Sequence, residues 1–149
     1  MHRVLVVDDQ SHVRSAIAAA LEAKGFSLAT AENGVDGLKL FRASKFDLVI
    51  ADIYMPGMDG VKLIKEMRTI DPNIAVVAIS GVLLRTTGRT ALDLLSMNRD
   101  LSAIATLQKP FRPAQLQQAI KKALDLVAAQ KGTARDAVAS PAEQAPTDG

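Results

Sequence analysis

Residues 47–60 read D-L-V-I-A-D-I-Y-M-P-G-M-D-G, and this stretch decides the fold. Its first half is a short apolar run, Leu48 to Ala51, which ends in the carboxylate of Asp52 and is followed by a loop rich in proline and glycine. A β-branched run of this length with such punctuation is typical of a strand buried on both faces. We therefore expect Asp52 at the carboxyl end of a strand, where open parallel α/β sheets bind their ligands.

The composition is ordinary for a soluble globular protein of about one domain. Of the 149 residues, 48% are hydrophobic and 23% are charged, and the net charge is +2. So small a net charge, with acids and bases interspersed, gives no argument for nucleic acid or a membrane as a partner. The absence of cysteine excludes disulfides, thiolate nucleophiles and cysteine-ligated metals. Neither a signal peptide nor a run of roughly 18 apolar residues is present, so we expect a cytoplasmic protein.

Strand and helix patterns alternate along the chain. Short apolar runs predict five strands, at residues 3–7, 27–31, 48–51, 74–79 and 103–107. Apolar residues at helical spacing predict five helices, near residues 11–24, 35–41, 61–70, 90–97 and 113–127. Ser11 is predicted to cap the first of them. Strict alternation implies a doubly wound α/β fold, an open five-stranded parallel sheet with helices on both faces and right-handed crossovers.

The last part of the chain has a different composition. From residue 131 onward it is dominated by Ala, Thr, Pro, Asp, Gln and Gly, with no aromatic residue and no periodicity. Such a segment buries too little apolar surface to offset the entropy of ordering it. We therefore predict one domain over residues 1–130 and a disordered C-terminal tail over residues 131–149.

Polar side chains are expected where four of these strands end. Asp8 and Asp9 follow the first strand, Asp52 the third, Ser80 the fourth and Lys109 the fifth. Because parallel strands end at one edge of a sheet, these five groups are expected close together. A strand-end aspartate alone is most often a helix cap or a turn residue, so the functional interpretation depends on the whole set.

Two local motifs accompany this polar set, D-x-x-M-P-x-M-D-G at residues 52–60 and K-P-F at residues 109–111. Together they resemble the receiver domain of two-component response regulators, over about residues 1–130. The resemblance is specific because five functional positions and two motifs agree in order. It implies the flavodoxin/CheY-like strand order 2-1-3-4-5, for which a chemotaxis member of the family is a standard example.

The resemblance also implies a role for each residue. Asp52 would accept a phosphoryl group from a phosphohistidine on a histidine kinase or a histidine phosphotransferase. Lys109 would pair with Asp52 at rest and with a phosphoryl oxygen afterwards, as a point charge on developing negative charge. The hydroxyl of Ser80 would donate a hydrogen bond to another phosphoryl oxygen.

A metal ion is part of the same expectation. Three crowded carboxylates repel one another unless a hard cation neutralises them, and Mg²⁺ takes oxygen ligands. Asp9 and Asp52 are expected to be direct ligands and Asp8 a ligand through water. By the resemblance, the backbone carbonyl of Tyr54, two residues past the nucleophile, completes the protein ligands.

Two features depart from the family pattern. The position three residues before the lysine, usually an aromatic switch residue, is Thr106, so the usual aromatic flip cannot operate. The segment between Ser80 and Lys109 is longer than is common, which places an insertion within Val82 to Ser102, normally the partner-binding face. We expect Ser80 to transmit the signal directly to that segment.

Three functions remain open at this point. The first is a single-domain response regulator without a DNA-binding domain, which is a phosphorelay intermediate or a diffusible regulator and catalyses only its own phosphorylation and dephosphorylation. The second is a pseudo-receiver, an interaction module that is never phosphorylated. The third is a phosphohydrolase of the haloacid-dehalogenase type, but that family needs a second aspartate where this chain has Tyr54.

Overall fold

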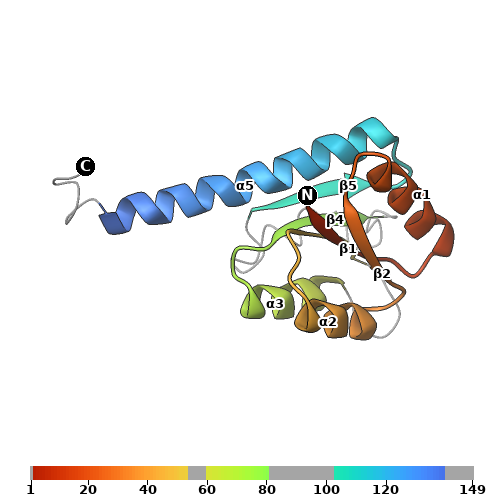
Figure 1. The fold of residues 1–149 in the computed structure, drawn as a ribbon, viewed down its shortest axis with the longest axis horizontal. Coiled ribbons are helices and arrows are strands. Elements are labelled where there is room, and N and C mark those ends of the chain that lie inside the picture. The colour runs from red at the N-terminus through yellow and green to blue at the C-terminus, as the bar shows by residue number, and fades with distance from the viewer. Residues whose placement is uncertain (1, 54–59, 81–102, 140–149) are drawn as a thin grey trace, which may run out of the picture.

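Five parallel strands form the centre of the protein, in the order β2-β1-β3-β4-β5 (Figure 1). The computed structural model describes residues 2–53, 60–80 and 103–139, and for residues 131–139 it describes the backbone alone. The strands are β1 (Arg3–Val7), β2 (Ser27–Ala31), β3 (Leu48–Asp52), β4 (Ala75–Ser80) and β5 (Ile104–Gln108). This order confirms the doubly wound fold predicted from the alternating pattern.

Helices cover both faces of the sheet. The described part of the chain holds α1 (Ser11–Glu22), α2 (Gly34–Ala43), α3 (Gly60–Ile70) and α5 (Pro113–Ala139). Helices α2 and α3 lie on one face, and α1 and α5 lie on the other (Figure 1). The remaining predicted helix, near residues 90–97, falls outside the described residues.

The sheet separates two apolar cores, and strand β3 contributes to both. Every residue of β3 and of β4 is buried, which explains why both strands read as continuous apolar runs. Successive side chains point to opposite faces. Val49 and Ala51 therefore pack with α2 and α3, whereas Leu48 and Ile50 pack with α1 and α5.

The start of α1 differs from the prediction. Gln10, and not Ser11, occupies the N-cap position, and Ser11 is the first residue of the helix. The reason lies in Asp8, whose Oδ1 accepts a hydrogen bond from the backbone N–H of Gln10 at 2.9 Å. An aspartate that binds the backbone two residues on forms a local turn, and this turn sets where the helix begins.

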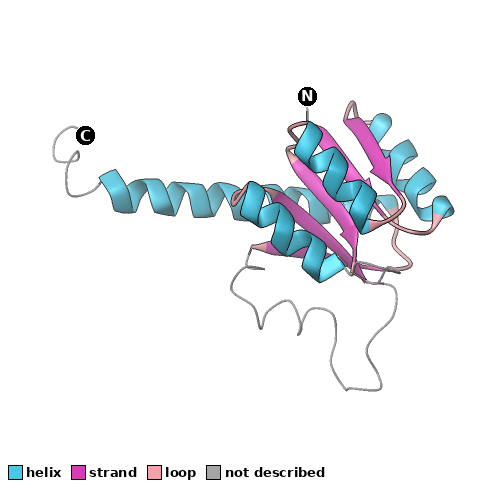
Figure 2. Cartoon of the chain, turned by 90° about the horizontal axis from the view of Figure 1, so that it is seen from below, coloured by secondary structure: helices cyan, strands magenta, loops and turns pink. Residues whose placement is uncertain are grey.

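Helix α5 is longer than the apolar pattern predicts. It runs past residue 130 to Ala139, and its second half projects beyond the edge of the sheet (Figure 2). Residues 131–139 are therefore helical where we expected a disordered tail, consistent with the high helix propensity of their alanines. Residues 140–149 lie outside the described residues, so a disordered tail there stays a prediction, as does a domain limited to residues 1–130. Among the described helices, none combines the length with the hydropathy that a membrane-spanning helix needs.

Candidate functional site

The predicted polar residues meet at the carboxyl edge of the sheet. Pairing of Val7 with Ala51 aligns β1 and β3, so the residues that follow, Asp8 and Asp52, lie side by side. Ser80 ends β4, and Lys109 comes directly after β5. The structure thus brings together the side chains of four predicted residues, Asp8, Asp9, Asp52 and Lys109, and the backbone of Ser80 is bonded to that of Lys109. Tyr54, the remaining predicted ligand, falls outside the described residues.

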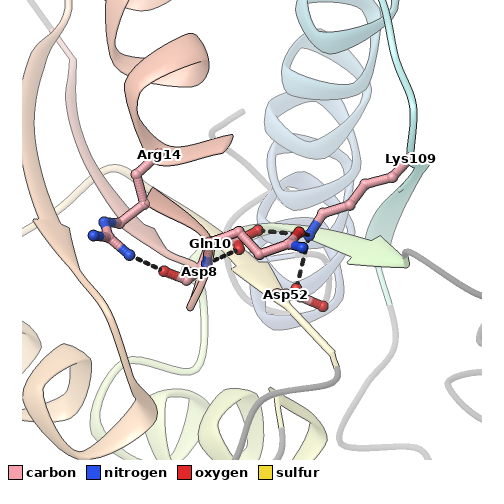
Figure 3. Close-up of polar contacts among 5 residues, drawn as sticks. All are labelled: Asp8, Gln10, Arg14, Asp52 and Lys109. Atoms are coloured by element: carbon pink, nitrogen blue, oxygen red, sulfur yellow. Dashed lines mark hydrogen bonds and ion pairs between the residues drawn. The ribbon is translucent and has the colours of Figure 1, made fainter. Parts of the chain in front are cut away.

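The ammonium group of Lys109 lies among three oxygen atoms (Figure 3). Its Nζ is 2.9 Å from Oδ2 of Asp52, 3.0 Å from Oδ2 of Asp8 and 2.8 Å from Oε1 of Gln10. The two carboxylates are buried, whereas Gln10 is exposed at the rim. Lys109 is therefore the compensating charge for two acids that the fold removes from water.

The electrostatics of Lys109 combine opposing effects. Burial alone lowers its pKa, because it penalises the charged ammonium. The hydrogen bond with Asp52, the close contact with Asp8 and the two negative charges outweigh burial, so the pKa of Lys109 is raised above its ordinary value of 10.5. The lysine is accordingly a fixed positive charge at neutral pH.

Asp8 is held by its neighbours in α1 and in the turn before it. Its Oδ1 accepts from the backbone N–H of Gln10, and its backbone carbonyl accepts from Nη1 of Arg14 at 2.6 Å (Figure 3). Its Oδ2 is fully buried and has no hydrogen-bond partner, although it lies close to the Lys109 ammonium. A buried carboxylate oxygen without a hydrogen bond is costly unless a cation is near.

Three carboxylates make a candidate cation site. One oxygen each from Asp8, Asp9 and Asp52 lie within 4.8 Å of one another. Asp9 is exposed while the other two are buried, so solvent and a hydrated ion reach the site from one side. The all-oxygen donor set of three carboxylates fits a hard divalent cation such as Mg²⁺.

Ser80 lies at the same edge and is part of the frame that positions the lysine. Ser80 is buried, and its backbone carbonyl accepts a hydrogen bond from the backbone N–H of Lys109 at 2.8 Å. This bond continues the pairing of β4 with β5, in which Ser80 lies opposite Gln108. The role of its hydroxyl stays a prediction.

The sequence did not predict the contacts that Gln10 and Gly60 make in the site. A Cβ atom at Gly60 would lie 2.6 Å from Cα of Ile53 and would also collide with the backbone carbonyl of Asp52. The N–H of Gly60 donates to the carbonyl of Ile53 at 2.8 Å, so the first residue of α3 lies directly against the end of β3. In the sequence, Gly60 is the last residue of the D-x-x-M-P-x-M-D-G motif, and the single available signal for Gln10 is its place right after Asp8 and Asp9.

Thr106 stands at the position where the family usually has an aromatic switch residue. It lies exposed in β5, opposite Ala78 of β4. Its short side chain offers little surface for alternation between a buried and an exposed position, as the sequence indicated. The segment Val82 to Ser102, where we expected the insertion and the signal, falls outside the described residues.

Comparisons with known proteins agree with this geometry. The family model of the response regulator receiver domain matches residues 4–121. Over 124 residues the chain is 32% identical to sporulation initiation phosphotransferase F of Bacillus subtilis, covering 83% of this chain and 94% of that protein. It is also 32% identical to chemotaxis protein CheY of the same organism over 125 residues, covering 83% and 98%. Other relatives are longer, and the chain spans about half of their length or less.

Solved structures show the same likeness. Chemotaxis protein CheY4 of Vibrio cholerae superposes with a TM-score of 0.73 at 25% identity, covering 83% of this chain and 99% of that one. The family match spans most of the chain and includes every residue of the acidic cluster and its lysine. The chain therefore belongs to the response regulator receiver domains, the signalling modules of two-component systems.

Proposed function

We propose that Asp52 accepts a phosphoryl group from a phosphohistidine on a histidine kinase or a histidine phosphotransferase. The observation that carries this proposal is the contact of the buried Asp52 carboxylate with the Lys109 ammonium at 2.9 Å, beside two further carboxylates. Phosphorylation would then change the contacts of this protein with a downstream protein. The chain would act as a phosphorelay intermediate or as a diffusible regulator. The names of two relatives, a phosphotransferase and a chemotaxis protein, support this reading.

The chemistry follows from the charges in the site. A carboxylate oxygen of Asp52 attacks phosphorus, the phosphorus–nitrogen bond breaks, and the imidazole leaves with the electron pair. Lys109 lies where it can move from Asp52 Oδ2 to a phosphoryl oxygen and stabilise its developing charge. Ser80 would donate its hydroxyl to a second phosphoryl oxygen.

Mg²⁺ is the proposed cofactor. When bound, it would neutralise the carboxylates and shield the phosphoryl oxygens from them. Asp9 and Asp52 would be its direct ligands, together with the backbone carbonyl of Tyr54. Asp8 would contribute through water, because its Oδ1 already accepts from Gln10 and its Oδ2 pairs with Lys109.

Intact-protein mass spectrometry tests the proposal. Incubation with acetyl phosphate and Mg²⁺ should add one phosphoryl group, and Asp52→Asn should abolish the adduct. Asp125→Asn, a change at an exposed acid of α5, should leave it unaffected. No adduct with any small phosphodonor would favour the pseudo-receiver, and repeated turnover of a phosphomonoester would favour the phosphohydrolase.

A further inference from the structure

The side chain of Gln10 does not cap helix α1, although the residue occupies the N-cap position. Gln10 is the N-cap of α1, with extended backbone angles of φ −96° and ψ 116°, but its side chain makes no capping hydrogen bond. Instead, Oε1 of Gln10 accepts a hydrogen bond from Nζ of Lys109 at 2.8 Å (Figure 3). The side chain is therefore committed to the site.

The backbone of Gln10 gives that contact a fixed base. Its N–H donates to Oδ1 of Asp8, and its carbonyl accepts from the backbone N–H groups of Val13 and Arg14 at 3.1 Å. The residue is thus anchored at one side to an acid of the site and at the other to the first turn of α1. A side chain that starts from an anchored backbone loses less freedom when it holds a partner.

The ammonium of Lys109 has three N–H donors, and three oxygens lie around it within 3.0 Å. Two of these oxygens belong to carboxylates that are also candidate ligands of a cation. The oxygen of Gln10 is the neutral one, and Gln10 is not a member of that acidic group. Direct binding of a cation by Asp52 would therefore weaken the contact of Lys109 with that carboxylate and leave its contact with Gln10.

From this arrangement we infer that Gln10 is a positioning residue, which holds the Lys109 ammonium beside Asp52 when that carboxylate binds a cation and thereby speeds phosphoryl acceptance. The inference rests on the proposed function of Asp52 for its kinetic part. Gln10 acts through Lys109. Its loss should therefore loosen the hold on the Lys109 ammonium, and the rate of phosphoryl acceptance should fall as a consequence. The expected loss of rate is roughly threefold to tenfold, the effect of one hydrogen bond.

Two variants separate this role from a merely structural one. Gln10→Leu keeps the size of the side chain and removes the acceptor, whereas Gln10→Glu keeps an oxygen acceptor at the same reach. Gln118→Leu, at an exposed glutamine of α5, is the matched control. Far-UV circular dichroism establishes that each variant is folded.

The first measurement follows the Lys109 ammonium by ¹⁵N NMR with Mg²⁺ present and no phosphodonor. Exchange of its protons with water should be several-fold faster in Gln10→Leu than in the wild type, and slow again in Gln10→Glu. The second measurement is the rate of the acetyl phosphate adduct at Asp52. Gln10→Leu should be slower than the wild type, and Gln118→Leu should match it in both measurements.

Unchanged ammonium exchange in Gln10→Leu would overturn the inference, and so would an unchanged phosphorylation rate in that variant. Failure of the proposed function is distinguishable, because the wild type would then form no adduct at all. The NMR comparison needs no phosphoryl group. It would still decide in that case whether Gln10 holds Lys109.

Discussion

The Nζ atom of Lys109 lies 2.9 Å from Oδ2 of Asp52, although the two residues are 57 positions apart in the chain. The contact joins the end of the central strand β3 to the residue that follows the edge strand β5. It places a positive charge next to the acid that we propose as the phosphoryl acceptor.

Lys109→Met should lower the free energy of unfolding near neutral pH by about 1–3 kcal/mol, because two buried carboxylates lose their compensating charge. The pKa of Lys109 is raised in the folded state, so its contribution is complete below the ordinary value of 10.5. The contribution is lost as pH rises through the higher folded-state pKa. The gap between wild type and variant should therefore be constant around neutral pH and shrink in strong alkali.

Urea denaturation followed by far-UV circular dichroism measures this gap. Lys122→Met, at an exposed lysine of α5, is the control and should change stability by less than about 0.5 kcal/mol. A gap that stays constant through strong alkali would show that Lys109 stabilises the fold by packing and not by charge.

The three acids should differ in their contribution to cation binding. Asp9→Asn and Asp52→Asn should each weaken Mg²⁺ binding more than Asp8→Asn, because a direct ligand loses an inner-sphere contact and a water-mediated one does not. The contacts of Asp8 with Gln10 and Lys109 support its indirect role. Isothermal titration of each variant, with Asp125→Asn as control, measures the order. Equal losses for Asp8→Asn and Asp9→Asn would refute this order of ligands.

Gly60→Ala should slow phosphorylation of Asp52, because the added methyl group would push against the backbone of Asp52 and Ile53. Gly37→Ala is the matched comparison, since its Cβ would lie 2.8 Å from a methyl group of Val7 in the core. Both changes should reduce stability by about 1–3 kcal/mol, the usual range for overpacking. Only Gly60→Ala should also reduce the rate of the acetyl phosphate adduct at saturating Mg²⁺. Equal rates in the two variants would contradict the positioning role of Gly60.

Ile50→Ala should destabilise the fold by about 2–5 kcal/mol, the range for deleting a buried aliphatic side chain. Ile50 is fully buried in the central strand and packs in the core with α1 and α5. Val35→Ala is the control, since Val35 is 52% exposed and its truncation should cost less than about 0.5 kcal/mol. Urea midpoints of the two variants give the comparison. Similar midpoints would mean that β3 is not the centre of the core.

The architecture could be predicted from the sequence, because the spacing of apolar residues and the positions of turn residues are local signals. The continuous apolar run of β3 predicted a strand buried on both faces, the run of β4 predicted a further strand, and alternation with helices predicted the parallel sheet. The edge at which Asp52 and Lys109 meet followed from the same reasoning, since parallel strands all end on one side. The strand order itself came from the family resemblance.

Only the tertiary structure decided which atoms meet at that edge. Nothing in the residue type of Gln10 indicates that its side chain binds Lys109, and the start of α1 depended on a turn made by Asp8. The collision that a side chain at Gly60 would make with Asp52 is likewise a matter of packing. These contacts depend on distances between residues that are far apart in the chain. Local sequence patterns do not determine such distances. The contacts exist only once the two cores have fixed the strands beside one another.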